Sequence, residues 1–299
     1  MHFEVFEKPK TRADYRAFYR AFSQRPFDVV LAMQANLRIN LLYPALHAPL
    51  KIGFDRTRAR EGQWLFCNRA IPFANSHLLD SFMSFAGQLD AAPVPITWDM
   101  PIGEAEESWA REQLKHLPRP LIAIHPVSSK MERTWLFERY SEVMQSAAQR
   151  WGAGLILTGG TASLEMDFCA HLASAAPLGT LNLCGKTTPK QLAALLGQVD
   201  VLLAPDTGPV HLATAMHTPV VGLYAVAPPS LSGPYAQQEF IVNRYPEAVR
   251  KFLGKDPLRV PWNTRVHHPE AMALIQTADV LQQLARVLDE RKSPASNHD

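Results

Sequence analysis

The sequence predicts an α/β protein in which helices cover parallel sheets. Short continuous apolar runs recur along the second half of the chain, for example at 121–125 and 154–158, and such runs are typical of buried parallel strands. Helical patterns separate these runs, and repeated strand–helix units imply a parallel sheet between layers of helices. With 299 residues, the chain is long enough for two domains of ordinary size.

The first third of the chain contains one predicted strand, at 27–33, and several helical segments. We expect helices at 11–23 and 77–89 and a helix with a turn at 36–50. An aromatic stripe in the first helix indicates core packing, and its members are Tyr15, Phe18, Tyr19 and Phe22. Residues 52–62 are predicted to form a polar loop in which Arg56, Arg58 and Arg60 are solvated, the alternative being that these arginines hold an acidic acceptor.

The connection between the two domains is expected within 91–103. This stretch has little periodicity and contains Pro93, Pro95, Pro101 and Gly103, which is typical of a linker. We therefore divide the chain into an N-terminal domain, 1–105, and a C-terminal domain, 106–299.

The second half alternates between strands and helices. Strands are expected at 121–125, 154–158, 181–183, 200–204 and 220–224, and helices at 104–117, 135–150, 162–175, from Thr188, from Thr207 and at 278–290. The helix that begins at Thr188 has the clearest start signal, because Thr188 and Gln191 have the spacing of a capping box and Pro189 suits the first turn. Ligands of such sheets bind beyond the carboxyl ends of the strands.

Composition excludes several classes of protein. A net charge of +2 predicts no particular partner and does not suggest a nucleic-acid binder. The three cysteines, Cys67, Cys169 and Cys184, are far apart, so we expect inert core thiols rather than a disulfide framework or a zinc site. The N-terminus lacks the pattern of a secretory signal, and no apolar run reaches the roughly 18 residues of a transmembrane segment. The expected location is the cytoplasm.

Several motifs of cofactor and nucleotide enzymes are missing from the sequence. No Gly-x-Gly-x-x-Gly, His-Glu-x-x-His or Gly-x-Ser-x-Gly occurs. The tripeptide Gly185-Lys186-Thr187 resembles the end of a phosphate-binding P-loop, but Gly179 is one residue too far upstream. We expect no cofactor and no metal.

The most informative stretch is Asp206-Thr-Gly-Pro-Val-His-Leu-Ala-Thr-Ala-Met-His-Thr-Pro219, which follows one apolar strand and precedes another. A tight turn that leads into a helix presents backbone N–H groups and the positive end of the helix dipole to an anion. Asp206 or Thr207 is expected to cap this helix, and Gly208 to let a phosphate approach the backbone. His211 follows about one helical turn later. The motif predicts a diphosphate-binding site.

A second anion-facing loop follows the strand at 121–125. Ser128 and Ser129 supply hydroxyls, and Lys130 and Arg133 supply cations for a second phosphate. A site that holds a diphosphate in this way suits a nucleotide-sugar donor, because it stabilises the charge that grows on the leaving nucleotide diphosphate.

These motifs resemble those of the lipopolysaccharide heptosyltransferases, glycosyltransferase family 9. The specific part is Asp206-Thr-Gly-Pro-Val-His-Leu-Ala with Pro219 and the stretch up to Gly233-Pro-Tyr235. The loop from His125-Pro126 to Trp135 and the segments 27–38 and 52–55 add to the likeness, which extends over about residues 26 to 290. The resemblance implies a GT-B architecture of two Rossmann-like domains with a cleft between them, inverting chemistry, and ADP-heptose as donor. It further implies a lipopolysaccharide core acceptor at the inner face of the cytoplasmic membrane, with the protein cytoplasmic or peripheral there.

The resemblance also implies roles for single residues. Asp206, Thr207, Gly208 and His211 belong to the donor diphosphate site, and Ser128 and Ser129 to its phosphate loop. Arg133 stands where the family usually has a phosphate-binding Lys, and Lys130 is an alternative. Ser163 stands where the family commonly has a Glu for a ribose hydroxyl, a role that Glu165 is a candidate to fill.

The start of the chain departs from the family pattern. Family members open with a strand, a glycine loop and a helix, and an Asp of that loop is the expected general base. This chain begins near the third strand of that domain, so we expect the N-terminal domain to be incomplete by roughly 50–70 residues. No residue is assigned as the base, and Asp28 is expected to be structural. Two other functions therefore stay open, a nucleotide-sugar epimerase of the same fold and a truncated, non-catalytic remnant that binds nucleotide.

Overall fold

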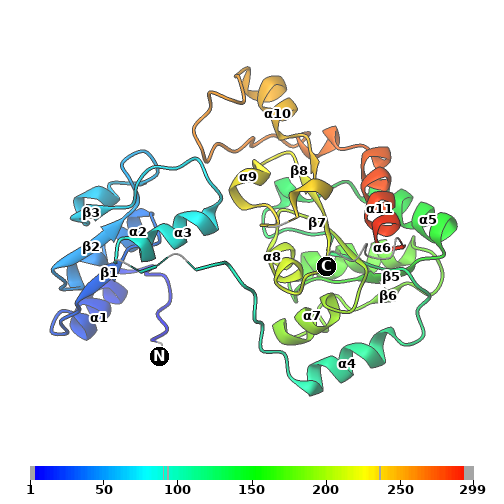
Figure 1. Cartoon of the computed structure of the whole chain (residues 1–299), viewed down its shortest axis with the longest axis horizontal. Coiled ribbons are helices and arrows are strands. Elements are labelled where there is room, and N and C mark those ends of the chain that lie inside the picture. Colours follow the sequence, from blue (N-terminus) through cyan, green and yellow to red (C-terminus); the bar gives the residue numbers. More distant parts are fainter. Residues whose placement is uncertain (1–3, 90, 93, 236, 293–299) are drawn as a thin grey trace. The chain divides into compact units, whose positions relative to one another are not determined.

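The structure is a computed structural model that describes residues 4–292 except 90, 93 and 236. The chain divides into two compact units, Met1–Pro95 (unit 1) and Ile96–Asp299 (unit 2), which Figure 1 shows with their helices and strands. Both units are built on parallel sheets, so the predicted α/β class is confirmed. The predicted domain ranges of 1–105 and 106–299, with their separate roles, stay a prediction.

Unit 1 has a three-stranded parallel sheet in the order β1-β2-β3. Its elements are α1 (Arg12–Phe22), β1 (Val29–Leu31), α2 (Leu37–Asn40), β2 (Leu50–Gly53), β3 (Arg69–Ala70) and α3 (Leu78–Gly87), with short 3-10 turns at Tyr43–Ala45 and Gln63–Leu65. Thr11 and Asp14 form a capping box that fixes the start of α1. The predicted aromatic stripe is confirmed as core at Phe18 and Phe22, which are buried, whereas Tyr19 remains exposed.

The expectation of a polar, solvated loop at 52–62 is wrong at two points. Ile52 and Gly53 belong to β2, and Arg58 is buried with only 3% of its surface exposed. Arg58 pairs with Asp55 and donates further hydrogen bonds to Ser81 and to the carbonyl oxygens of Pro72 and Ala74. Every arm of its guanidinium is therefore engaged within unit 1, which excludes both solvation and contact with an acidic acceptor.

Unit 2 has a six-stranded parallel sheet in the order β6-β5-β4-β7-β8-β9. Its strands are β4 (Leu121–Ile124), β5 (Gly154–Leu157), β6 (Leu181–Asn182), β7 (Val201–Pro205), β8 (Val220–Tyr224) and β9 (Val242–Asn243). Its helices are α4 (Glu104–Leu114), α5 (Phe137–Trp151), α6 (Ser163–Ser174), α7 (Pro189–Leu196), α8 (Gly208–Ala215), α9 (Pro229–Ser232), α10 (Tyr245–Ala248) and α11 (Thr277–Lys292), with a π-helical turn at Val249–Leu253. The strand order matches the doubly wound dinucleotide-binding fold.

Alternate residues of the unit 2 strands enter two different cores. In β4, Ile122 and Ile124 pack into the core beneath α5 and α11, whereas Leu121 and Ala123 pack into the core beneath α4, α7 and α8. Figure 1 shows α5 beside α11 and α4 beside α7. Because both faces are covered, the strands are apolar throughout, which is the pattern that the sequence shows.

Most predicted elements of unit 2 are confirmed within a residue or two. The capping box of Thr188 and Gln191 is present at the start of α7, with Pro189 in the first turn. The two-residue strand β9 and the π-helical turn are not predicted from the sequence, because neither contains enough residues to show a period.

Candidate functional site

The candidate site lies where the strand order of the unit 2 sheet reverses. β4 and β7 are neighbours, but the chain continues from β4 toward one edge of the sheet, through β5 and β6, and from β7 toward the other edge, through β8 and β9. Ligands of open α/β sheets bind beyond the carboxyl ends of the strands at such a point. His125 extends the ladder through a 3.0 Å hydrogen bond from its N–H to the carbonyl of Leu203. The loop after β4 and the turn after β7 therefore leave the sheet side by side.

Two contacts join these loops. The Ser128 hydroxyl donates a 3.1 Å hydrogen bond to the carbonyl oxygen of Asp206. The Arg133 guanidinium lies 3.1 Å from the Asp206 carboxylate, and this pair is only 22% and 10% exposed. The structure thus brings together Ser128, Arg133 and Asp206 from the two predicted anion-facing loops.

The predicted cap of α8 is wrong in its chemistry. Thr207 occupies the N-cap position, but its side chain makes no capping hydrogen bond, and the Asp206 carboxylate is turned to Arg133 instead. Because no side chain caps this end, the N–H of Gly208 is left to other acceptors. A methyl group at Gly208 would have no protein atom within 4 Å, so packing within the described chain does not require glycine here.

Three further predicted site residues are exposed around this centre. Ser129 and Lys130 follow Ser128 in the loop, and the Lys130 N–H lies 3.4 Å from the Ser128 hydroxyl oxygen. His211 lies on the exposed side of α8, in its first turn. These side chains lie at the surface and do not fill the core, and their role in binding a ligand stays a prediction.

The loop after β4 is held by two buried aromatic residues. The Tyr140 hydroxyl donates a 3.2 Å hydrogen bond to the carbonyl of Pro126, and the Trp135 indole N–H donates one of 3.2 Å to the carbonyl of Ile275. The two rings meet edge to face, with 5.0 Å between their centres. Trp135 is therefore a buried packing residue of this loop.

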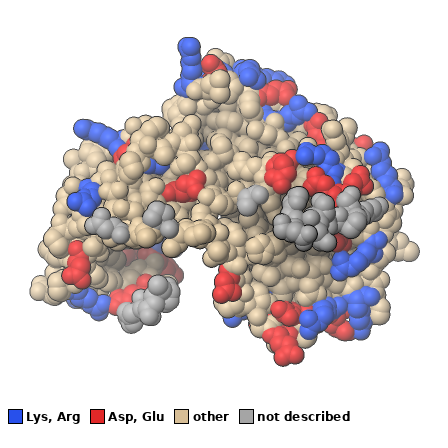
Figure 2. Space-filling view, viewed as in Figure 1, with Lys and Arg blue, Asp and Glu red and all other residues tan. Residues whose placement is uncertain are grey.

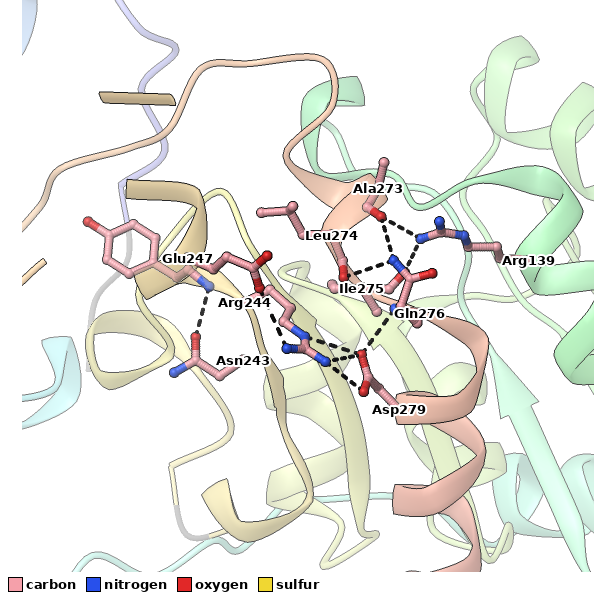
Figure 3. A network of polar contacts seen from close by, with 10 residues as sticks. Arg139, Asn243, Arg244, Glu247, Ala273, Leu274, Ile275, Gln276 and Asp279 are labelled. Carbon is pink, nitrogen blue, oxygen red and sulfur yellow. Dashed lines mark hydrogen bonds and ion pairs between the residues drawn. The ribbon is translucent and has the colours of Figure 1, made fainter. Parts of the chain in front are cut away.

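The Ile275 segment is itself fixed by a polar network that the sequence analysis missed (Figure 3). Arg139 donates to the carbonyl oxygens of Ala273 and Ile275, and Arg244 holds Asp279 through contacts of 2.6 and 2.7 Å. Partial burial is the largest single influence on Asp279 and opposes its ionisation. The hydrogen bonds from Arg244 and from the Gln276 N–H, together with the charges of Arg244 and Arg139, outweigh this burial and hold the pKa of the carboxyl below its usual value. Through Ile275 and Trp135, the start of α11 supports the loop that carries Arg133.

His125 is a buried neutral residue rather than a surface base. Its ring nitrogen Nδ1 lies 3.1 Å from the Thr158 hydroxyl, and only 6% of the residue is exposed. Burial lowers the pKa of His125 to about 4. The residue is therefore uncharged at neutral pH and adds no cation to the site.

The turn after β5 is tightly packed. The Gly160 N–H donates a 2.5 Å hydrogen bond to Glu165, so this carboxylate is bound within its own turn. A side chain at Gly159 would collide with the thiol of Cys184, which lies beside Cys169. Hydrogen bonding between the two thiols raises the pKa of Cys169 and lowers that of Cys184. Both cysteines are buried, as expected for core residues.

Other kinds of site find no support in the described part of the chain. It contains no group of three His, Cys, Asp or Glu side chains that could hold a metal ion. None of its helices is long and apolar enough to cross a membrane. On the face in Figure 2, basic and acidic side chains are interspersed with wide uncharged areas, unlike the continuous basic surface of a nucleic-acid binder.

Comparison with known proteins gives the same family as the motifs. The family model of glycosyltransferase family 9 (heptosyltransferase) matches residues 15–257. The chain is 36% identical to the lipopolysaccharide core heptosyltransferase OpsX of Haemophilus influenzae over 91% of its own length and 78% of that protein.

Solved structures agree on the fold. A glycosyltransferase family 9 protein from Veillonella parvula matches with a TM-score of 0.72 at 20% identity, over 93% of this chain and 78% of that one. ADP-heptose lipopolysaccharide heptosyltransferase II of Escherichia coli matches with a TM-score of 0.65 at 18% identity, over 94% of this chain and 82% of that one. The chain belongs to glycosyltransferase family 9 and is a glycosyltransferase of the GT-B type.

Proposed function

We propose that this protein transfers heptose from ADP-heptose to the inner core of lipopolysaccharide. Family membership and the likeness to a lipopolysaccharide core heptosyltransferase support this reaction. The observation that carries it is the joint between the two anion-facing loops, Ser128 to Asp206 and Arg133 to Asp206, at the strand-order reversal of unit 2. We assign unit 2 to the donor and unit 1 to the acceptor.

The donor diphosphate is placed at the start of α8. The Gly208 N–H and the positive end of the helix dipole face it, and the absence of protein atoms above Gly208 lets an oxygen approach the backbone. We assign the cations of Arg133, Lys130 and His211 and the hydroxyls of Thr207 and Ser129 to the same diphosphate. As the bond to the sugar breaks, negative charge grows on ADP, and these fixed donors stabilise it more strongly than they stabilise the bound donor.

Ser128 and Asp206 act on the donor through their neighbours. The Ser128 hydroxyl donates its hydrogen bond to the Asp206 carbonyl oxygen, and the Asp206 carboxylate orients Arg133. The Nε atom of Arg133 is buried without a hydrogen-bond partner among the described residues, so this guanidinium retains donor capacity for a phosphate.

The acceptor places the reaction at the inner face of the cytoplasmic membrane. A lipopolysaccharide core precursor is anchored there by its lipid, so an enzyme that acts on it works at the membrane surface. Location in the cytoplasm and attachment to the membrane surface are both part of this proposal.

The two other functions left open by the sequence predict different products. An epimerase releases free nucleotide and an altered sugar without any acceptor, and family membership gives it no support. A non-catalytic remnant binds ADP but releases no heptose to any acceptor.

One assay separates the three. Purified protein is supplied with ADP-heptose and a lipid-free core acceptor, and both ADP release and the acceptor mass are followed. We expect ADP release only with acceptor, together with a mass gain of one heptose. Arg133→Gln should lower kcat/KM by about a hundredfold, whereas Arg150→Gln, an exposed change of equal charge on α5, should not. ADP binding without turnover on any core acceptor would overturn the proposal.

A further inference from the structure

Charge is distributed unequally between the two units. Residues 1–95 contain twelve Lys and Arg against eight Asp and Glu, whereas residues 96–299 contain eighteen against twenty. The small net charge of the whole chain therefore conceals a basic unit 1 and a slightly acidic unit 2. A basic unit is attracted to anionic surfaces.

Three of the twelve basic residues of unit 1 lie on α1. Arg12, Arg16 and Arg20 follow one another at four-residue spacing, so they form one stripe along the helix, and all three are exposed. Phe18 and Phe22 anchor the other side of α1 in the core of unit 1. The stripe is therefore held outward by packing, and the structure pairs none of its three arginines with a described residue.

α2 continues this surface with a further cation and apolar side chains. The Tyr15 hydroxyl donates a 3.1 Å hydrogen bond to the carbonyl of Arg38, and the Tyr19 hydroxyl donates one of 3.0 Å to the carbonyl of Leu41. These bonds fix α2 against α1. We call the surface of Arg12, Arg16, Arg20, Tyr19, Leu37, Arg38 and Leu41 the α1–α2 face.

The α1–α2 face combines charge with exposed apolar surface. Leu37 is 51% exposed, Leu41 40% and Tyr19 37%, beside the arginine stripe. Two acids that touch these elements are engaged by backbone groups. Asp14 accepts from the N–H groups of Lys10 and Thr11, and Glu61 accepts from that of Leu37. Asp14 also points away from the stripe, being about half a turn round the helix from Arg16.

We propose that the α1–α2 face docks on an anionic phospholipid bilayer. Arginines bind lipid phosphates, while leucine and tyrosine side chains enter the boundary between headgroups and acyl chains. An acidic protein partner would match the arginines but would leave the exposed leucines without a matching surface. The inference rests on the proposed peripheral location and names the surface responsible for it.

Vesicle binding of the full-length protein tests the inference without donor or acceptor. We expect sedimentation with vesicles of mixed phosphatidylglycerol and phosphatidylcholine, and little with phosphatidylcholine alone. Each arginine at an anionic surface contributes about fivefold to partitioning. The triple variant Arg12→Gln, Arg16→Gln, Arg20→Gln should therefore bind about a hundredfold more weakly, and raised salt should weaken the wild type in the same direction.

The matched control removes the same charge from unit 2. Arg150→Gln, Lys190→Gln and Lys255→Gln are exposed changes, and the triple control should bind vesicles as the wild type does. Equal binding by the two triple variants, or equal binding of the wild type to both kinds of vesicle, would overturn the inference. Turnover on a lipid-free core acceptor is a separate readout: the α1 variant should keep it, and its absence in the wild type would count against the proposed function and not against docking.

Discussion

The hydroxyl of Ser128 lies 3.1 Å from the main-chain carbonyl oxygen of Asp206, and the two residues are 78 positions apart in the sequence. This bond and the Arg133–Asp206 ion pair connect two loops, and each loop carries half of the proposed donor site. A change in either loop should therefore alter the other.

Ser128→Ala should reduce stability as well as donor binding. The buried hydroxyl makes the bond to Asp206, and losing one such bond costs about 1 kcal/mol of the free energy of unfolding. The exposed neighbour Ser129 provides the control. Ser129→Ala should change the free energy of unfolding by no more than about 0.5 kcal/mol and should weaken only the binding of ADP. Denaturant unfolding and ADP calorimetry of both variants check this. Equal stability of the two would show that the joint is not important for the fold.

Gly208→Ala should separate binding from folding. No described protein atom lies within 4 Å of the added methyl group, so the unfolding free energy should change by less than about 1 kcal/mol. The methyl group would occupy the space into which the diphosphate is proposed to fit, so ADP should bind at least about tenfold more weakly.

Gly159→Ala serves as the comparison for Gly208→Ala, because here the added methyl group meets protein atoms and should affect folding. Its methyl group would collide with the thiol of Cys184, so we expect a loss of about 1–3 kcal/mol of stability. Unchanged ADP affinity in Gly208→Ala, measured by calorimetry, would move the diphosphate away from the start of α8.

His125 should make unit 2 sensitive to mild acid. Its folded pKa of about 4 lies below the ordinary value of 6.5, so the unfolded chain binds the proton more readily. The stabilising effect is complete above pH 6.5 and is lost as the pH falls toward 4. Between pH 7 and pH 5 the loss should be about 2 kcal/mol.

The variant His125→Asn isolates this effect, because it cannot take up a proton. Its unfolding free energy should fall less steeply between pH 7 and pH 5 than that of the wild type. Parallel curves in urea titrations at the two pH values would show that another group is responsible.

Arg58→Met should destabilise unit 1 strongly. The substitution leaves Asp55 without its buried partner, and breaking such a pair costs about 3–5 kcal/mol. Arg60 lies two residues away and is exposed, so Arg60→Met should stay within about 0.5 kcal/mol. Hydrogen exchange of peptides from β2 and α3 reports on this unit directly. Similar exchange in both variants would contradict the structural role of Arg58.

The sequence predicts best those features that neighbouring residues determine. The strands of unit 2 were recognisable because both of their faces are buried, and α7 because its capping box and Pro189 are local signals. The carboxyl-edge loops follow from strand direction alone, so the sequence predicts the residues of the proposed donor site without any knowledge of their contacts.

Features that depend on distant partners were not predictable in the same way. The residues around Arg58 are polar, as in a solvent-exposed loop. Only its contacts with Pro72, Ala74 and Ser81, which are distant in the sequence, show that Arg58 is buried. Asp206 was expected to cap α8 because Asp is a good N-cap residue, but the cation of Arg133 competes for its carboxylate. The network of Arg139, Arg244 and Asp279 joins segments that have no common sequence pattern.

The strand order of unit 2 also has a consequence for assembly of the protein. β4 and β7 lie side by side in the sheet, yet α5, β5, α6, β6 and α7 intervene along the chain. While the ribosome has delivered only the residues up to the end of α7, the loop after β4 is present but its counterpart is not. We therefore expect ADP to bind only chains in which both loops have been synthesised, and saturating ADP should act as a ligand that favours the folded form of unit 2.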